Sequence, residues 1–312
     1  MTTATPTTPP TTDVTPAPAT GNPRGTEERS AFAMAAPAVI LLTLFLIIPA
    51  AFALGLSFTN ARLISPNTPE FVGISNYQRA LTADPTFLRS IVNTFYFAAV
   101  VVPVQAGFAL VLALLINRKI RAVNAFRTIY FMPVVTSMVV VSILWTFMYQ
   151  ETGLINSAIS ALTGGAFEGQ AWLANPATAM PAIMVLSIWQ GVGFHMIVWL
   201  SGLQTIPGVL YEAADIDGAT PWQKFRHITL PGLKPTLVFI VITITIAALG
   251  LFVQIDVMTR GGPLESTTTL IFHAIRKGYR EQEVGYGAAL SLIFFAIVLV
   301  VSLIQQRITR ED

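Results

Sequence analysis

The chain has 312 residues, of which 54% are apolar and only 11% charged, and its mean hydropathy is +0.66. Soluble domains carry roughly 25% charged residues, so this composition indicates a protein of the lipid bilayer. A net charge of +2 is too small for nucleic-acid binding. The absence of cysteine excludes disulfides, thiolate metal sites and a cysteine nucleophile.

The N-terminal segment differs from the rest of the chain. Residues 1–23 are mostly Thr, Pro and Ala, and Asp13 is their only charged residue. Such a composition cannot bury enough surface to offset chain entropy, so we predict a disordered cytoplasmic tail over residues 1–30. A cleaved signal peptide is not expected, because Arg24 and Arg29 follow this segment and the next apolar run is too long.

Six apolar runs are each long enough to cross a hydrocarbon core, which needs about 20 helical residues. Backbone groups in lipid must be satisfied within the segment, so the runs predict helices. The alternative, buried helices of a large soluble protein, does not account for six such runs. The fold class is therefore all-α, a polytopic membrane domain over residues 31–310. Its expected spans are Phe32–Leu56, Ile91–Ile116, Ile129–Met148, Pro181–Leu203, Thr236–Ile255 and Ala288–Ile304.

Basic residues predict the orientation of these spans. The cluster Arg118, Lys119 and Arg121 is the strongest anchor, and basic loops favour the cytoplasm. Both termini and residues 204–234 are therefore expected on the cytoplasmic side of a plasma membrane. Three segments are then expected outside, and within the last of them Thr268–Arg280 predicts a short helix at the outer rim or a re-entrant piece. These outer segments are 58–90, 150–180 and 256–286.

Ionisable groups are scarce in the expected spans. His195 in the fourth is the clearest exception, and Asp256 lies just beyond the fifth. Proton-coupled carriers often place carboxylates within the membrane, so their absence disfavours that class without excluding sodium coupling through carbonyl groups. The spans also contain no catalytic dyad or metal cluster, so we do not expect an enzyme. Energy for uphill transport would come from another subunit.

Residues 207–231, between the fourth and fifth spans, carry the signals of two short helices joined at a corner. Pro207 can open the first helix, and Gly218 can take the left-handed conformation that ends it. Thr220 suits the N-cap of a second helix and Pro221 its first residue. We expect Leu230-Pro231 to end this second helix.

Alanines and an aromatic ridge give this segment an apolar face. Trp222, Phe225 and Ile228 follow one another at intervals of three. Such a face can insert into a groove on another protein. It can equally rest on lipid headgroups, as many amphipathic loops do. These physical features alone leave the two interpretations open.

The order of residues in this segment resembles the EAA loop of the membrane subunits of bacterial binding-protein-dependent ABC importers. The matching positions are Glu212, Ala213, Ala214, Gly218, Phe225, Ile228, Leu230 and Pro231. Four further segments resemble the carbohydrate-importer branch of this family, which includes maltose-type and glycerol-3-phosphate-type members. These are Gly202–Pro207, Ile216–Ala219, Phe71–Tyr77 and Gly261–Pro263.

The resemblance implies the six-helix arrangement of an ABC type I importer permease. The EAA segment would dock in a cleft of a cytoplasmic ATPase and carry its motion into the spans. The chain has no phosphate-binding loop motif, so ATP and Mg would bind the partner ATPase subunits and this chain would bind no cofactor. The residues expected to couple are Glu212, Ala213, Ala214, Asp217, Gly218, Ala219, Trp222, Phe225, Leu230 and Pro231.

The resemblance also implies several partners. They are a second, homologous permease subunit, two ATP-binding subunits and an extracytoplasmic solute-binding protein. The lipid membrane completes the assembly, and no nucleic acid is expected.

A sugar site needs hydrogen-bonding groups beside an apolar platform, because sugars have polar edges and apolar faces. The fourth and fifth spans supply such groups, and the resemblance places substrate contacts there. Each of these residues also has a packing interpretation, and the site can instead lie on the partner permease. The candidates are Ser187, Trp189, Gln190, Gly191, His195, Thr245 and Gln254.

Two other functions remain open. The run Thr267-Thr268-Thr269-Leu270-Ile271 also resembles permeases for glycerol-3-phosphate, although the spans lack the basic cluster that a phosphate would require. A carrier that works alone on an ion gradient is the alternative from a different class.

Overall fold

The computed structural model describes residues 23–65, 67–117 and 123–310. Over these residues the chain is helices joined by loops, with one isolated antiparallel bridge between Thr59 and Phe71. The expected all-α class is thus confirmed. The described residues form two compact units, which are divided between Ala51 and Phe52.

The first unit contains the start of a long helical segment, in which α1 (Pro23–Leu42), η1 (Thr43–Ile47) and α2 (Ile48–Ser57) follow one another. Residues 33–57 match the first expected span. The tail was predicted to reach residue 30, yet the helix already begins at Pro23, a residue well suited to a first helical turn. Residues 1–22 of that predicted tail lie outside the described residues.

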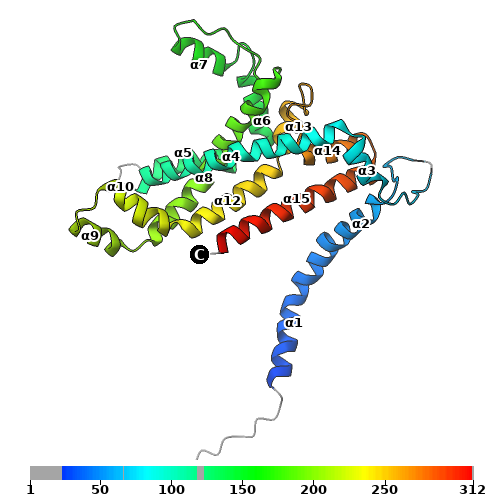
Figure 1. Cartoon of the computed structure of the whole chain (residues 1–312), viewed down its shortest axis with the longest axis horizontal. Coiled ribbons are helices and arrows are strands. Elements are labelled where there is room, and N and C mark those ends of the chain that lie inside the picture. The colour runs from blue at the N-terminus through cyan, green and yellow to red at the C-terminus, as the bar shows by residue number, and fades with distance from the viewer. Residues whose placement is uncertain (1–22, 66, 118–122, 311–312) are drawn as a thin grey trace, which may run out of the picture. The chain divides into compact units, whose positions relative to one another are not determined.

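The second unit is built on four long helices: α4 (Pro85–Asn117), α8 (Pro176–Thr205), α12 (Lys234–Leu249) and α15 (Val284–Arg310). α4 packs along α8 and α12, and α12 also contacts α15 (Figure 1). Buried Trp199 donates its indole N–H to the Ala106 carbonyl at 3.0 Å and so joins α8 to α4. At Gly202 a Cβ would lie 2.3 Å from Thr236 Oγ1, which shows how closely α8 approaches α12.

The third expected span is not one straight helix. It consists of α5 (Val123–Val135) and α6 (Met138–Met148), which meet at an angle of 98°. Pro133 lacks the N–H that would continue the helical ladder, and Ser137 has extended backbone angles. The described residues therefore hold five helices that could each cross a membrane, or six if this bent pair counts as one span.

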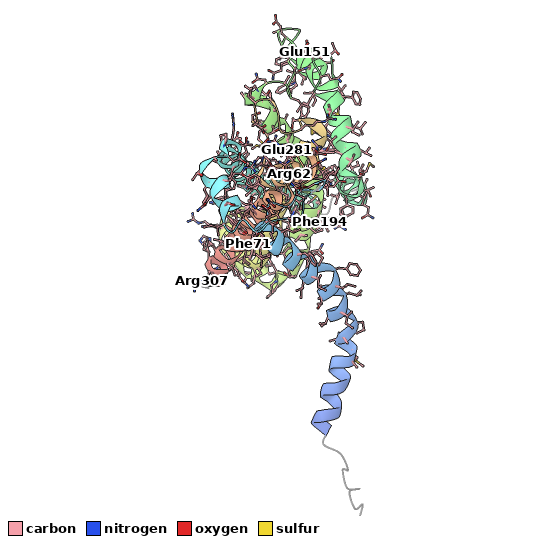
Figure 2. The ribbon with its side chains drawn as sticks, turned by 90° about the vertical axis from the view of Figure 1, so that its right-hand side faces the viewer. Arg62, Phe71, Glu151, Phe194, Glu281 and Arg307 are labelled. Carbon is pink, nitrogen blue, oxygen red and sulfur yellow. The ribbon has the colours of Figure 1, made fainter. Side chains whose placement is uncertain are left out.

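Shorter elements gather at the two ends of the second unit (Figure 1). One end, which we call the loop end, carries residues 207–231. Its elements are α9 (Gly208–Ile216), α10 (Pro221–Lys224), η2 (Phe225–Thr229) and α11 (Leu230–Gly232). The other end, which we call the α14 end, carries four short elements. They are α3 (Ser75–Thr82), α13 (Val253–Met258), α14 (Leu270–Ile275) and η3 (Arg276–Arg280). Figure 2 views the α14 end, with Arg62 and Glu281 near its middle. A further helix, α7 (Leu154–Leu162), follows α6.

Two local expectations can be compared with these elements. Residues 268–280 do contain a short packed helix, because α14 and η3 lie against α15 and α4. The prediction that Leu230-Pro231 ends the second helix of the loop is wrong. The π-turn η2 lets the Leu230 N–H bond to the Phe225 carbonyl, and Pro231 then falls in the first turn of α11, where its missing N–H costs nothing.

Candidate functional site

The corner between α9 and α10 has the construction that its residues predicted. Gly218 has a φ of +72°, and a Cβ there would meet nothing within 4 Å, so backbone conformation rather than space requires glycine. Thr220 caps α10 in a reciprocal box with Gln223: the Thr220 N–H donates to Gln223 Oε1 at 2.7 Å, and Thr220 Oγ1 accepts from the Gln223 N–H. Pro221 is the first residue of α10.

Two contacts close the corner into one unit. Lys224 forms an ion pair with Asp215, which joins α10 to α9. The hydroxyl groups of Tyr211 and buried Thr229 lie 2.9 Å apart. Sequence reasoning missed the Tyr211–Thr229 contact, because the sequence shows each residue only as an isolated polar group on an amphipathic helix.

The residues expected to couple lie on this accessible loop. Trp222 is 66% exposed and stacks on Phe225 with ring centroids 5.6 Å apart, while Ile216 is 87% exposed. Glu212, Ala213 and Leu230 are exposed as well. Beside them is a cavity of about 320 Å³. Its walls are formed by Ala214, Asp217, Gly218, Ala219, Gln223, Lys224, His227 and Ile228.

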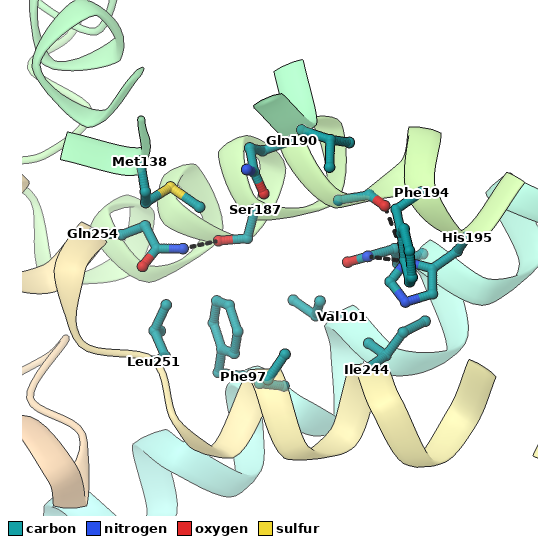
Figure 3. Close-up of a pocket in the computed structure, with 15 residues that line it drawn as sticks. Phe97, Val101, Met138, Ser187, Gln190, Phe194, His195, Ile244, Leu251 and Gln254 are labelled. Atoms are coloured by element: carbon teal, nitrogen blue, oxygen red, sulfur yellow. Dashed lines mark hydrogen bonds between the residues drawn. The ribbon is translucent and has the colours of Figure 1, made fainter. Parts of the chain in front are cut away.

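A second cavity, of about 260 Å³, lies between the long helices (Figure 3). The elements α4, α5, α6, α8, α12 and α13 all contribute to it, and most of its wall is apolar. None of the described residues that line it carries a formal charge. They are Phe97, Val101, Gln105, Val134, Met138, Ser187, Gln190, Gly191, Phe194, His195, Ile244, Ala247, Ala248, Leu251 and Gln254.

The structure brings together most of the residues proposed for the substrate path. Ser187, Gln190, Gly191, His195 and Gln254 line this cavity, and Gln254 Nε2 lies 3.4 Å from Ser187 Oγ.

Trp189 and Thr245 do not line the cavity. The Trp189 ring packs on Trp145 with centroids 5.4 Å apart. The Thr245 hydroxyl donates to the Val241 carbonyl at 2.7 Å and accepts from Gln305 Nε2 at 2.8 Å. Both residues thus have the packing role that was the alternative interpretation.

Gln105 is the polar residue of the cavity wall that sequence reasoning missed. Its amide lies 3.0 Å from His195 Nδ1, and that nitrogen is also 2.9 Å from the Gly191 carbonyl. A carbonyl only accepts, so Nδ1 carries the proton when it bonds to Gly191, and Nε2 is then an acceptor. In the other tautomer Nδ1 has no proton and can accept from Gln105 Nε2, so the two bonds are alternatives. A Cβ on Gly191 would lie 2.4 Å from Gln105 Nε2, so this glycine makes room for Gln105.

A buried polar network at the α14 end was also missed. Asp84 Oδ2 accepts from Tyr286 Oη and from His273 Nε2, each at 2.7 Å. Arg276 donates to both oxygens of Glu265 at 2.9 and 3.0 Å and lies 3.3 Å from His273 Nδ1. The only sequence signal was the presence of one acid and one histidine in separate loops. No cluster of three metal-ligating side chains occurs in the described parts of the chain.

This network predicts that acidification destabilises the protein. Burial lowers the pKa of His273, so below its ordinary pKa of about 6.5 the unfolded chain binds a proton that the folded chain resists. Burial pushes the pKa of Asp84 upward, but hydrogen bonds from Tyr286 and His273 outweigh it and leave the pKa lowered. Both groups therefore stabilise the fold at neutral pH, and this stability is lost as the pH falls.

Thermal unfolding in detergent at about pH 7.5 and about pH 5.5 measures this effect. The melting temperature should fall by a few degrees at the lower pH. In His273→Gln, whose amide can still donate to Asp84, most of that fall should disappear. An equal fall in both proteins would show that other groups are responsible.

Comparison with known proteins agrees with this geometry. Residues 81–311 match the family model described as binding-protein-dependent transport system inner membrane component. The lactose transport system permease protein LacF of Rhizobium radiobacter is 36% identical, over 88% of this chain and 92% of its own length. The sulfoquinovosyl glycerol transport system permease protein SmoG of Agrobacterium fabrum is 37% identical, over 88% of each.

A solved structure has the same fold. It is a chain in the crystal structure of a bacterial alginate ABC transporter in complex with an alginate pentasaccharide-bound periplasmic protein. It matches with a TM-score of 0.80 at 24% identity, over 92% of this chain and 96% of its own. The resemblance seen around Glu212–Pro231 is thereby confirmed, and the chain belongs to the family of binding-protein-dependent transport system inner membrane components.

Proposed function

We propose that the chain forms the translocation path of an ATP-driven importer for a sugar, whether a monosaccharide, an oligosaccharide or a polyol. The single observation that carries this proposal is the uncharged, largely apolar cavity with a few polar groups between α4, α8 and α12. Sugars present apolar ring faces and polar edges, which suit such a wall. The relative named for lactose, a neutral sugar, supports this cargo class.

Ser187, Gln190, His195, Gln254 and Gln105 would supply hydrogen bonds to the cargo. Because no described residue of the cavity wall is charged, an anionic cargo would enter without a counterion, and burying an unpaired charge is costly. Glycerol-3-phosphate is therefore the weaker candidate within the same class of importer.

Energy would enter through the segment 207–231, which we call the coupling loop. Its exposed apolar side chains, Ile216 and Trp222 among them, are held on a rigid corner, as expected of a surface that another protein covers. We infer that two cytoplasmic ATPase subunits dock there and bind ATP and Mg, while this chain binds no cofactor and catalyses no reaction. The loop end and both termini would then face the cytoplasm, and the α14 end would face an extracytoplasmic binding protein.

A second, homologous permease subunit would complete the membrane core. The family is binding-protein-dependent, and such permeases commonly work in pairs. The variants below test whether the residues that contact the sugar lie on this chain or on the second permease subunit.

Reconstitution tests the proposed function. Vesicles that contain the complete complex should take up the labelled cargo sugar. This uptake should require both ATP and the cognate binding protein. A panel of neutral sugars and glycerol-3-phosphate, offered to the isolated binding protein, identifies the cargo class. A preference for glycerol-3-phosphate would overturn the neutral-cargo proposal. ATP-independent uptake by this chain alone, along an ion gradient, would overturn the importer.

Substitution in the cavity gives a sharper test. Gln190→Leu keeps the size of the side chain but removes its amide, so uptake should fall several-fold while ATPase association stays normal. Thr243→Val is the matched control, since Thr243 bonds back to its own helix and does not line the cavity. Equal uptake by the two variants would remove Gln190 from the substrate path.

A further inference from the structure

The fifth span is interrupted at the α14 end of the cavity. α12 ends at Leu249, and Gly250, Leu251 and Phe252 separate it from α13. Leu251 within this break and Gln254 in the first turn of α13 both line the cavity. Figure 3 shows them on the side of the cavity opposite His195. The break therefore determines how α13 closes this end.

One side chain from another segment holds the break. Thr269 donates its hydroxyl to the Leu251 carbonyl at 2.7 Å, and both residues are buried, Thr269 completely. A carbonyl released by a helix break needs a new partner when water is absent. The Thr269 hydroxyl supplies that partner from a position 18 residues further along the chain.

Thr269 is itself well anchored. It is the last of three consecutive threonines, all with 0% exposure, whose other two hydroxyl groups bond to carbonyls of Gly262 and Gly261. The neighbouring backbone is fastened to α4: Asn93 Nδ2 donates to the Thr268 carbonyl at 2.9 Å, and the Leu270 N–H donates to Thr94 Oγ1 at 3.0 Å. Of the three hydroxyl groups, that of Thr269 reaches the break.

We propose that Thr269 is a positioning residue for transport, a latch that holds the α12–α13 break and thereby keeps α13 closed over the cavity. The direction of opening rests on the proposed function, because α13 lies at the end that would receive cargo. A single hydrogen bond is suited to this task, since it orders the break and can still be broken in each cycle. Asp256 on α13 also pairs with Arg280 on η3, so the latch acts alongside one ion pair.

Cross-linking across the cavity tests the latch without knowledge of the cargo. The side chains of Gln254 and Ser187 meet across the cavity, with Gln254 Nε2 3.4 Å from Ser187 Oγ, so a short bifunctional thiol reagent should link cysteines at these two positions when α13 is closed. The native chain has no cysteine, so this pair would be its only one. The rate of cross-link formation is measured in the complete complex, without cargo, in the presence of an excess of the thiol reagent.

Thr269→Val removes the hydroxyl at nearly constant shape, and Thr269→Ser keeps it. We expect cross-linking to slow at least threefold with Thr269→Val and to stay near the native rate with Thr269→Ser. Thr267→Val is the matched control, because Thr267 is equally buried but bonds to Gly262. It should leave the rate unchanged.

Two results would overturn the latch. One is an equal cross-linking rate in Thr269→Val and the native chain. The other is a cross-linking rate in Thr269→Ser that is slower than in the native chain, because the methyl group rather than the hydroxyl would then hold the break. This second test can still be made if Thr269→Val does not insert into the membrane. If the native chain, without the two cysteines, showed no ATP-driven uptake while the cysteine pair gave the expected cross-linking pattern, the proposed function would be overturned and the latch would remain.

Discussion

Gly218→Pro in the coupling loop is expected to abolish uptake and ATPase association while the spans remain inserted. The φ of Gly218 is +72°, whereas proline holds φ near about −65°. Proline would also remove the N–H that bonds to the Asp215 carbonyl at 3.2 Å. Any residue with a Cβ costs about 1–2 kcal/mol in this conformation, which corresponds to roughly a tenfold loss of the competent loop. Proline should cost more.

Two further variants make the Gly218 result specific. Asparagine tolerates the left-handed conformation better than most residues, so Gly218→Asn should keep much of the activity. Gly208→Ala, in the same loop, should be nearly neutral, since Gly208 has no positive φ and a Cβ there would meet nothing within 4 Å. Copurification with the ATPase and vesicle uptake are the measurements. Normal coupling in Gly218→Pro would exclude the loop as the route of energy.

Charge on the exposed side of α9 can be tested in the same assays. Glu212 is exposed and its carboxylate is free to meet a basic group of an ATPase subunit. Glu212→Lys should therefore also abolish uptake and loosen the ATPase. If Glu212→Lys still associated with the ATPase subunits, the charge contact would be excluded. The role of the Gly218 corner would not be affected by that result.

Gly193→Ala is expected to destabilise the membrane domain strongly. A Cβ at Gly193 would lie 1.8 Å from the Tyr130 carbonyl oxygen, so α5 cannot stay where it packs on α8. The obstruction is backbone, which cannot move aside as a flexible side chain can. Overpacking of this kind typically costs about 1–3 kcal/mol. We expect a lower melting temperature in detergent and a lower yield of monodisperse protein.

The matched control is Gly107→Ala, the same substitution in the interior of α4. Nothing lies within 4 Å of a Cβ at Gly107, and alanine favours helix by about 1 kcal/mol over glycine. This variant should be at least as stable as the native chain. If the two variants had equal melting temperatures, the close approach of α5 to α8 would not contribute to stability.

Local signals predicted most of the helices and the whole corner at Gly218. Runs of about 20 apolar residues identify spans because lipid leaves few alternatives to a helix. Gly218, Thr220 and Pro221 have conformational preferences strong enough to determine the turn and the cap on their own. The same reasoning failed at Leu230-Pro231, where a π-turn shifts the hydrogen-bond register so that proline is accommodated.

The candidate site was only partly predictable. Ser187, Gln190 and Gln254 were expected near the substrate and do line the cavity. Gln105 was missed because one glutamine in an apolar helix has no distinguishing local signal. Thr245 was also expected near the substrate, but it does not line the cavity and its hydroxyl meets Gln305, which lies 60 residues away. Which face of a helix meets a cavity depends on the packing of neighbouring helices.

By itself, the sequence determined that this is an all-helical membrane protein with a structured loop at residues 207–231, and the order of residues in that loop predicted its family. These properties depend on composition, on runs of adjacent residues and on local backbone preferences. Only the tertiary structure decided the 98° bend between α5 and α6, the pairing of Gln105 with His195, and the bond from Thr269 to the break beside Leu251. The two hydrogen bonds join groups that are separated in sequence and that only helix packing brings together, and Pro133 by itself does not specify the angle of the bend.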